Sequence, residues 1–242
     1  MSRNRKGTGG VGRGANASAA QTVPLWGPEI KYVLLDMDGT LLDKYFDDYF
    51  WEHLVPEKYA EKHSITFGRA KEELMKKYKH HEGTLNWTDI DFWSRELDLD
   101  IPALKEQIRH LIEVHPHVED FLRLLKRHRK KVYIVTNAHI KVLDLKMKKT
   151  NIGRYFDTCI TSFEMGYPKE DLRFWQKAQE RLGFRKEEAL FIDDTEEILK
   201  TAHRFGIRYI VFKARATSKK EPKPSKDFLT ITDFNELCDE SV

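Results

Sequence analysis

Residues 30–40 read Ile30-Lys31-Tyr32-Val33-Leu34-Leu35-Asp36-Met37-Asp38-Gly39-Thr40. The first six residues are mostly apolar and favour β-structure, as is typical of a short strand buried on both faces of a parallel sheet. Two carboxylates and a glycine follow at the point where the strand must end, and Gly39 permits a tight backbone turn. The stretch therefore predicts a buried strand that carries a compact acidic loop at its end.

Similar apolar runs recur along the chain, at residues 131–136, 156–161, 189–193 and 208–212. They alternate with segments whose apolar residues have helical spacing, at residues 116–128, 139–149, 169–182 and 195–205. This alternation predicts an α/β fold with a doubly wound parallel sheet that helices cover on both faces. A Lys/Pro-rich loop at residues 218–226 precedes a last expected strand and helix within residues 228–238.

One interval interrupts this rhythm, because no strong strand pattern occurs between Leu41 and His115. Helical spacing continues there, at residues 45–59, 68–79, 86–97 and 101–111. We therefore expect an α/β core at residues 23–43 and 115–242, with a small helical cap inserted at residues 44–114. Residues 1–22 are basic, contain no acidic residue and have few large apolar side chains, so we expect a disordered tail.

The composition excludes several classes of protein. With 42 Lys and Arg against 39 Asp and Glu, the formal net charge is only +3, which argues against dedicated nucleic-acid binding. No stretch approaches the roughly 18–20 apolar residues that a membrane span needs, and no secretory signal is expected. The two cysteines, Cys159 and Cys238, are too few for a disulfide framework and form no zinc-binding pair, which favours a cytoplasmic setting. The oligomeric state stays open.

The acidic loop offers two carboxylates two residues apart, Asp36 and Asp38. One of them can attack phosphorus while it also contacts Mg²⁺, and the other can protonate the leaving oxygen. The alternative is an ordinary loop with acidic capping residues, because Asp and Gly are common in turns.

Polar residues also follow three other predicted strands. Thr136 and Asn137 can bind a phosphoryl oxygen, although this is also an ordinary strand-to-turn dipeptide. Lys169 can neutralise charge next to a phosphate, although an isolated lysine is usually solvated. The adjacent acids Asp193 and Asp194 suit Mg²⁺, although they could instead cap the following helix. Because ligand sites of open α/β sheets lie at the carboxyl ends of the strands, these residues together predict one site.

These motifs resemble those of the haloacid dehalogenase superfamily of phosphohydrolases, over about residues 30–212. The resemblance implies that Asp36 is the nucleophile and Asp38 the general acid/base, and that Thr136 and Lys169 bind the phosphoryl group. One departure stands out, since most relatives have proline directly after the lysine, where this chain has Glu170.

The resemblance also implies a metal cofactor, Mg²⁺. Its ligands would be Asp36, the backbone carbonyl of Asp38 and Asp194, with Asp193 acting through water. The helical insertion is similar to the family's small helical cap, the part of these enzymes in which substrate choice usually resides.

A narrower resemblance, to bacterial purine 5′-nucleotidases that act on GMP and IMP, extends into the cap. It is carried by Leu41-Leu42-Asp43, Asp47-Asp48-Tyr49-Phe50-Trp51, Leu54-Val55-Pro56-Glu57, Leu85-Asn86-Trp87, Thr136-Asn137-Ala138-His139, Gly166-Tyr167-Pro168-Lys169-Glu170-Asp171 and Phe205-Gly206-Ile207-Arg208-Tyr209. The implied substrate is a small phosphomonoester, a purine nucleoside monophosphate. Asn86, Trp87 and Asn137 are the expected substrate-binding residues, because an aromatic ring can stack on a base. Most cap aromatics could instead form the cap's own core.

Three other functions stay open. A phosphatase or phosphomutase for a sugar phosphate or another small metabolite shares all of these motifs. A dehalogenase is disfavoured, because those relatives usually lack an acid at the position of Asp38. A non-catalytic binding protein on the same fold would be expected to have lost the nucleophile, the lysine or a metal-binding acid, and this chain has them all.

Overall fold

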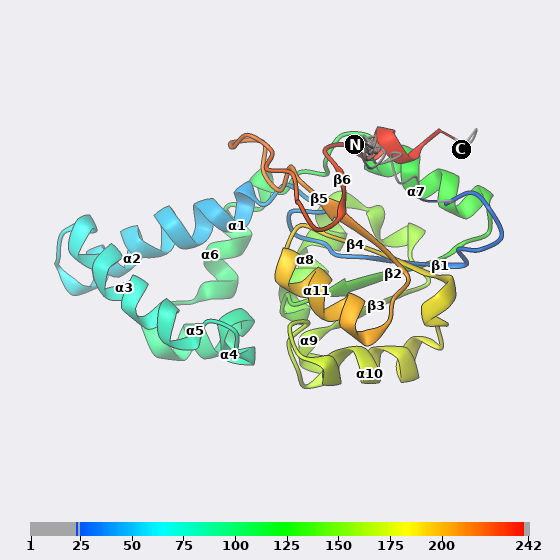
Figure 1. Ribbon diagram of the computed structural model, residues 1–242. Helices are drawn as coiled ribbons and strands as arrows, with labels where there is room; N and C mark the ends of the chain where they lie inside the picture. The colour runs from blue at the N-terminus through cyan, green and yellow to red at the C-terminus, as the bar shows by residue number, and fades with distance from the viewer. Residues whose placement is uncertain (1–22, 24, 240–242) are drawn as a thin grey trace, which may run out of the picture.

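The computed structural model describes residue 23 and residues 25–239, so the tail predicted at residues 1–22 lies outside the described part. A sheet of six parallel strands forms the centre of the molecule, in the order β3-β2-β1-β4-β5-β6 (Figure 1). The strands are β1 (Tyr32–Leu35), β2 (Lys131–Thr136), β3 (Thr158–Thr161), β4 (Ala189–Asp193), β5 (Tyr209–Lys213) and β6 (Leu229–Ile231). The predicted parallel sheet is confirmed.

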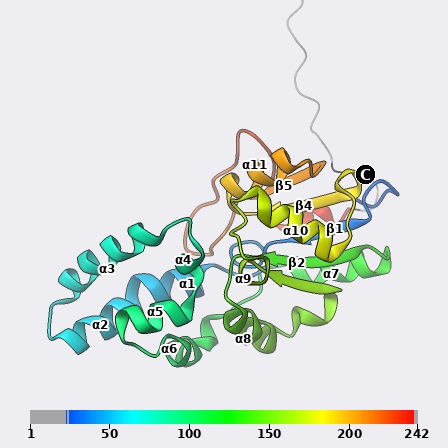
Figure 2. The ribbon, with the colours of Figure 1, turned by 90° about the horizontal axis from the view of Figure 1, so that it is seen from below.

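Helices cover both faces of this sheet (Figure 2). Leu34 packs in one hydrophobic cluster with α10 and α11, whereas Val33 and Leu35 belong to the cluster of the opposite face, with α7 and α8. These alternate contacts explain why the whole of β1 is apolar. The helices of this part are α7 (Val118–Arg127), α8 (Ile140–Thr150), α9 (Ser162–Met165), α10 (Leu172–Leu182) and α11 (Glu196–Phe205), with the 3₁₀ turns η3 (Ile152–Tyr155), η4 (Lys186–Glu188) and η5 (Phe234–Leu237).

The segment at residues 44–114 is helical, as the sequence predicted. Its elements are α1 (Tyr45–Tyr49), the π-helical segment η1 (Phe50–Leu54), α2 (Val55–His63), α3 (Phe67–His81), α4 (Leu85–Thr88), α5 (Ile90–Leu97), α6 (Ile101–Gln107) and the 3₁₀ turn η2 (Arg109–Leu111). The first three run on without a break as one long helix. Figures 1 and 2 show this helical insertion beside the α/β part.

The prediction of one helix over residues 86–97 is wrong, because two helices occupy this segment. The break lies at Asp89, whose carboxylate accepts hydrogen bonds from the backbone N–H groups of Asp91 and Phe92 at 2.8 and 3.0 Å. Such a side chain satisfies the free donors at a helix start and so favours a new helix over continuation of the old one.

A continuous hydrophobic core joins the insertion to one face of the sheet. Phe46 and Phe50 of the insertion belong to the same cluster of buried side chains as Phe121 of α7 and Val33 of β1. The division into two domains at residues 44 and 114 stays a prediction. Among the described residues, no helix combines the length and the apolar composition that crossing a bilayer requires.

Candidate active site

The acidic loop begins where the sheet's connections change direction, between β1 and β4. The backbone N–H of Asp36 donates to the carbonyl of Ile192 in β4 at 3.0 Å, which extends the strand pairing to the first acid. Gly39 has a φ of +90°, and a Cβ at this position would lie 2.3 Å from Oδ2 of Asp194. Only glycine lets the loop approach the second acidic segment this closely.

A buried lysine joins the two acidic segments. The Nζ of Lys169 donates to Oδ1 of Asp36 at 2.5 Å and to Oδ2 of Asp193 at 2.7 Å, and all three side chains are buried. Its place is fixed by its backbone, because the Asn137 side chain accepts from the Lys169 N–H at 2.9 Å and the Trp175 indole donates to the Lys169 carbonyl at 2.8 Å. The residue types predicted from the sequence therefore meet at one point.

Glu170, the residue that departs from the family pattern, takes part in this arrangement. Its carboxylate accepts a hydrogen bond from the side-chain amide of Asn137 at 3.0 Å. The Asn137 side chain thus contacts both the Lys169 backbone and Glu170 and helps to hold the lysine loop in place, although no proline follows the lysine. Its predicted contact with substrate stays a prediction.

Burial dominates the electrostatics of this site. It raises the pKa of Asp193 well above its usual range and the pKa of Asp194 to about 6, even though the Lys44 ammonium lies 3.5 Å from Asp194. Burial alone would lower the pKa of Lys169, but the carboxylates of Asp193 and Asp36 raise it above its ordinary value. The site has three carboxylates and only two lysine ammonium groups, and this excess of negative charge favours binding of a further cation.

Three carboxylates are placed to hold that cation. Oxygen atoms of Asp36, Asp193 and Asp194 lie within 4.8 Å of one another, and such hard oxygen ligands are those that Mg²⁺ prefers. Both Asp193 oxygens already accept hydrogen bonds, from Lys169 and from the backbone N–H of Thr195 at 2.8 Å. Asp36 and Asp194 are therefore the better candidates for direct ligands, and the donor set fits Mg²⁺.

Thr136 ends β2 beside the acidic loop, because Leu35 of β1 is in register with Ile134 of β2. The Thr136 side chain is buried, and its hydroxyl oxygen accepts from the backbone N–H of Ala138 at 3.0 Å. The predicted donation from this hydroxyl to a phosphoryl oxygen stays a prediction.

Asp38 lies in a second charged group that the sequence interpretation missed. Its Oδ1 accepts from Nζ of Lys146 at 2.6 Å, and Lys146 also donates to Asp47 at 2.5 Å. Asp47 in turn accepts from Lys105 at 2.8 Å. A signal was available, because Lys146 lies four residues after Val142 on the apolar face of α8. Burial raises the pKa of Asp38 to about 6, against the opposing effect of Lys146.

The predicted base-binding residues, Asn86 and Trp87, lie in α4. Figures 1 and 2 place this helix on the side of the insertion that faces the α/β part. Trp87 is 41% exposed, whereas Trp93 is buried and donates from its indole to the Trp87 carbonyl at 3.0 Å. Asn86 is also exposed. Their contact with substrate stays a prediction.

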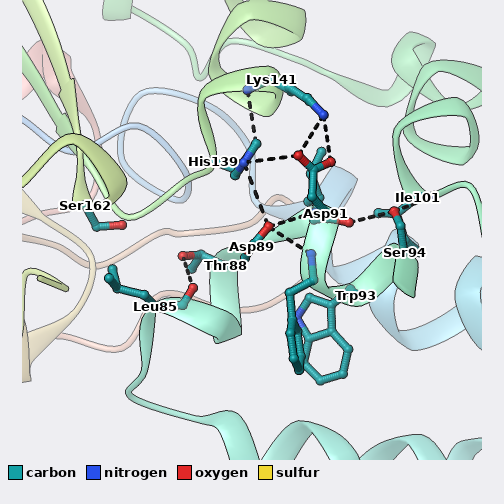
Figure 3. Close-up of polar contacts among 12 residues, drawn as sticks. Leu85, Thr88, Asp89, Asp91, Trp93, Ser94, Ile101, His139, Lys141 and Ser162 are labelled. Carbon is teal, nitrogen blue, oxygen red and sulfur yellow. Dashed lines mark hydrogen bonds and ion pairs between the residues drawn. The ribbon is translucent and has the colours of Figure 1, made fainter. Parts of the chain in front are cut away.

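The start of α5 meets the start of α8 in a polar seam formed by Asp89, Asp91, His139 and Lys141 (Figure 3). The Lys141 ammonium donates to both oxygens of Asp91 at 2.7 Å. Nδ1 of His139 accepts from the Lys141 N–H at 3.3 Å, and its Nε2 lies 3.9 Å from both carboxylates. This acid and histidine group could hold a metal ion, but the ammonium already pairs with Asp91, so we interpret the seam as a contact between the insertion and the α/β part.

Comparison with known proteins agrees with this geometry. A family model described as haloacid dehalogenase-like hydrolase matches residues 30–206. The GMP/IMP nucleotidase YrfG of Escherichia coli (strain K12) is 38% identical over 209 residues, which are 86% of this chain and 94% of that protein. The (S)-2-haloacid dehalogenase 4A of Burkholderia cepacia is 23% identical over 201 residues, 75% of this chain and 82% of that protein.

Among solved structures, an HAD phosphatase from Thermococcus onnurineus superposes with a TM-score of 0.73 at 27% identity, over 86% of this chain and 96% of that chain. The sequence motifs, the fold and these comparisons thus agree on one family. The chain belongs to the haloacid dehalogenase-like hydrolase family.

Proposed function

We propose that this protein is a Mg²⁺-dependent phosphomonoesterase that forms an aspartyl-phosphate on Asp36 and acts on purine nucleoside monophosphates. The observation that carries the proposal is the buried Lys169 ammonium between Asp36 and Asp193, with Asp194 beside them. The similarity to a GMP/IMP nucleotidase over most of both chains supports the substrate class. The chain contains only two cysteines, a usage that fits the reducing cytoplasm in which we propose to place the protein.

In the first step, a carboxylate oxygen of Asp36 attacks phosphorus in line with the leaving ester oxygen. The new O–P bond forms while the P–O bond to the leaving group breaks, and Asp38 gives its proton to the leaving oxygen. Lys169 orients Asp36 through Oδ1 and places positive charge beside the phosphoryl oxygens. Asp36, Asp194 and the Asp38 carbonyl would hold Mg²⁺, which supplies further positive charge to the phosphoryl group.

In the second step, Asp38, now a carboxylate, takes a proton from a water molecule that attacks phosphorus. The bond between phosphorus and Asp36 breaks, inorganic phosphate leaves, and both acids return to their starting states. A pKa raised by burial to about 6 fits a group that must both give and take a proton near neutral pH.

The base of the substrate is assigned to α4. Of the cap aromatics considered from the sequence, Phe46, Phe50 and Trp93 are buried, and Tyr49, Trp51 and Phe92 pack against the same core. Trp87 is exposed, and we propose that its ring stacks on the purine. Asn86 and Asn137 are the proposed polar partners of the substrate.

A phosphate-release screen with Mg²⁺ across GMP, IMP, AMP and sugar phosphates tests the proposal. We expect the highest kcat/KM for GMP and IMP. A strong preference for a sugar phosphate would overturn the nucleotidase assignment, and phosphate retained on the product would reveal a phosphomutase. Failure to release phosphate from any of these compounds or from an aryl phosphate would leave a binding protein, and halide release from a 2-haloacid would indicate a dehalogenase.

A further inference from the structure

The two carboxylates of the acidic loop are held by different buried lysines. Lys169 donates to Asp36, whereas Lys146 of α8 donates to Asp38 at 2.6 Å. The Lys146 side chain is only 1% exposed. Each carboxylate therefore has its own ammonium partner, and the two lysines come from different parts of the structure. Only one residue lies between the two acids in the sequence.

Asp38 and Lys146 begin a chain of alternating charges that continues through Asp47 to Lys105 in the helical insertion. Lys146 donates to Asp47 of α1 at 2.5 Å, and Asp47 accepts from Lys105 of α6 at 2.8 Å. The Lys105 ammonium lies 4.2 Å from the centre of the Phe50 ring, a cation–π contact that helps to hold it in an apolar setting. When Asp38 and Asp47 are ionised, the positive charges of Lys146 and Lys105 balance their two negative charges.

These four charged side chains would be an unfavourable choice if they served only to fill the interior, because burying charge costs free energy. Buried ions lose several kcal/mol of hydration each, and well-packed apolar residues of similar size are often at least as stable. Lys146 lies on the apolar face of α8, three and four residues after the buried Leu143 and Val142. An apolar residue would satisfy that face, so the ammonium group has a task that packing does not require.

We infer that Lys146 is a positioning residue for proton transfer: it fixes Oδ1 of Asp38, leaves Oδ2 to exchange the proton with the leaving oxygen, and through Asp47 ties this orientation to the helical insertion. This inference rests on the proposed function, in which Asp38 is the acid/base. It assigns to α1, α8 and Lys105 a role in the chemistry that no motif of the acidic loop specifies.

The leaving group separates this role from a structural one. A nucleoside leaves as a poor alkoxide unless it receives a proton, whereas nitrophenolate leaves readily without one. Loss of the Asp38 orientation therefore slows the first step for GMP and spares it for p-nitrophenyl phosphate. General acid catalysis contributes about 10²–10⁴-fold, and we expect misorientation to remove roughly 10–100-fold of that.

The test measures release of the leaving group in a single turnover, with enzyme and Mg²⁺ in excess. Lys146→Met should slow guanosine release by about 10–100-fold and leave nitrophenol release nearly unchanged, and Lys146→Arg should restore part of the loss. Lys149→Met, an exposed position on the same helix, is the matched control and should change neither rate.

The double variant Asp47→Leu/Lys146→Met removes one charge of each sign. This variant should remain slow with GMP, because charge balance alone does not orient Asp38. Recovery of the GMP rate would mean that Lys146 only neutralises Asp47, and it would overturn the inference. Asp47→Asn, which keeps the shape of the side chain, should show the same leaving-group pattern more weakly and serves if Lys146→Met does not fold.

Equal losses on both substrates, or no loss on either, would also overturn the inference. The proposed function fails by a different result, namely turnover in Asp36→Asn. If Asp36→Asn is inactive and Lys146→Met loses rate equally with GMP and p-nitrophenyl phosphate, the proposed phosphatase function is retained and only the positioning role of Lys146 is rejected.

Discussion

Among single residues, the acids at the ends of β1 and β4 form ion pairs with lysines from three different parts of the chain. Lys169 pairs with Asp36 and Asp193, and the other two pairs are Lys146 with Asp38 and Lys44 with Asp194. This division gives each carboxylate a different environment, although Asp36 and Asp193 are buried and Asp38 and Asp194 are only partly exposed. Such differences in environment allow neighbouring acids to take different chemical roles.

Replacing the proposed nucleophile tests the first of these roles. Asp36→Asn keeps the size of the side chain and removes its nucleophilic carboxylate, so turnover should fall to background while the protein stays folded. Phosphate release and a circular dichroism spectrum measure the two outcomes. Normal turnover would contradict the nucleophile assignment.

The metal-binding role gives a prediction that does not depend on activity. Mg²⁺ should raise the Tm of the protein, because a ligand that binds only the folded state stabilises it. Asp194→Asn should lose most of this increase, and Asp171→Asn, an acid outside the group, should keep it. Chelation should abolish phosphate release, and metal-independent hydrolysis would count against the site.

At the scale of elements, the sequence predicted the strands and most helices because their signals are local. The acid-rich strand ends could be assigned to one site because parallel strands bring their carboxyl ends to one edge. The break between α4 and α5 was missed because apolar spacing continues through Asp89, and only the capping chemistry of that residue stops the helix. The role of Glu170 was missed because its partner Asn137 lies 33 residues away in the chain.

The helix α4 carries the prediction on substrate binding. Trp87→Ala should raise KM for GMP with little change in kcat, because stacking binds the base in ground and transition states alike. A stacked base is worth about 1–3 kcal/mol, so we expect an increase of roughly 5–150-fold. Phe67→Ala, which removes an exposed aromatic side chain of α3, is the control. An unchanged KM would place the base elsewhere.

At the scale of the whole molecule, the helical insertion and the α/β part share one hydrophobic core and a chain of buried charges. The place of Lys146 on the apolar face of α8 was visible in the sequence, but its pairing with Asp38 was not, because the two residues are 108 positions apart. His115 lies where the chain returns from the insertion to the α/β part, and it contacts two other segments of that part. Its backbone N–H donates to the Leu41 carbonyl at 2.9 Å, and its Nε2 lies 3.2 Å from the Ala216 carbonyl oxygen.

This histidine makes global stability depend on pH. Burial lowers the pKa of His115 to about 4, from a usual value of about 6.5. Between these values the unfolded chain binds a proton that the folded protein lacks, so its contribution to stability is full above pH 6.5 and is lost as the pH falls towards 4. Urea unfolding at pH 7 and pH 5 should show a smaller loss of stability in His115→Gln than in the original protein, by about 2 kcal/mol. Equal losses would refute the assignment.

The Asp38→Ala variant shows whether the phosphoryl group passes through Asp36. With p-nitrophenyl phosphate and Mg²⁺, the first step needs no proton donor, whereas the second lacks its base, so the phosphorylated enzyme should accumulate. We predict a burst of one nitrophenol per enzyme molecule, and acid-quenched protein that carries a phosphoryl group on the peptide containing residue 36. The added change Asp36→Asn should abolish both. Steady turnover without a burst, or a phosphoryl group on another peptide, would show that Asp36 is not the nucleophile.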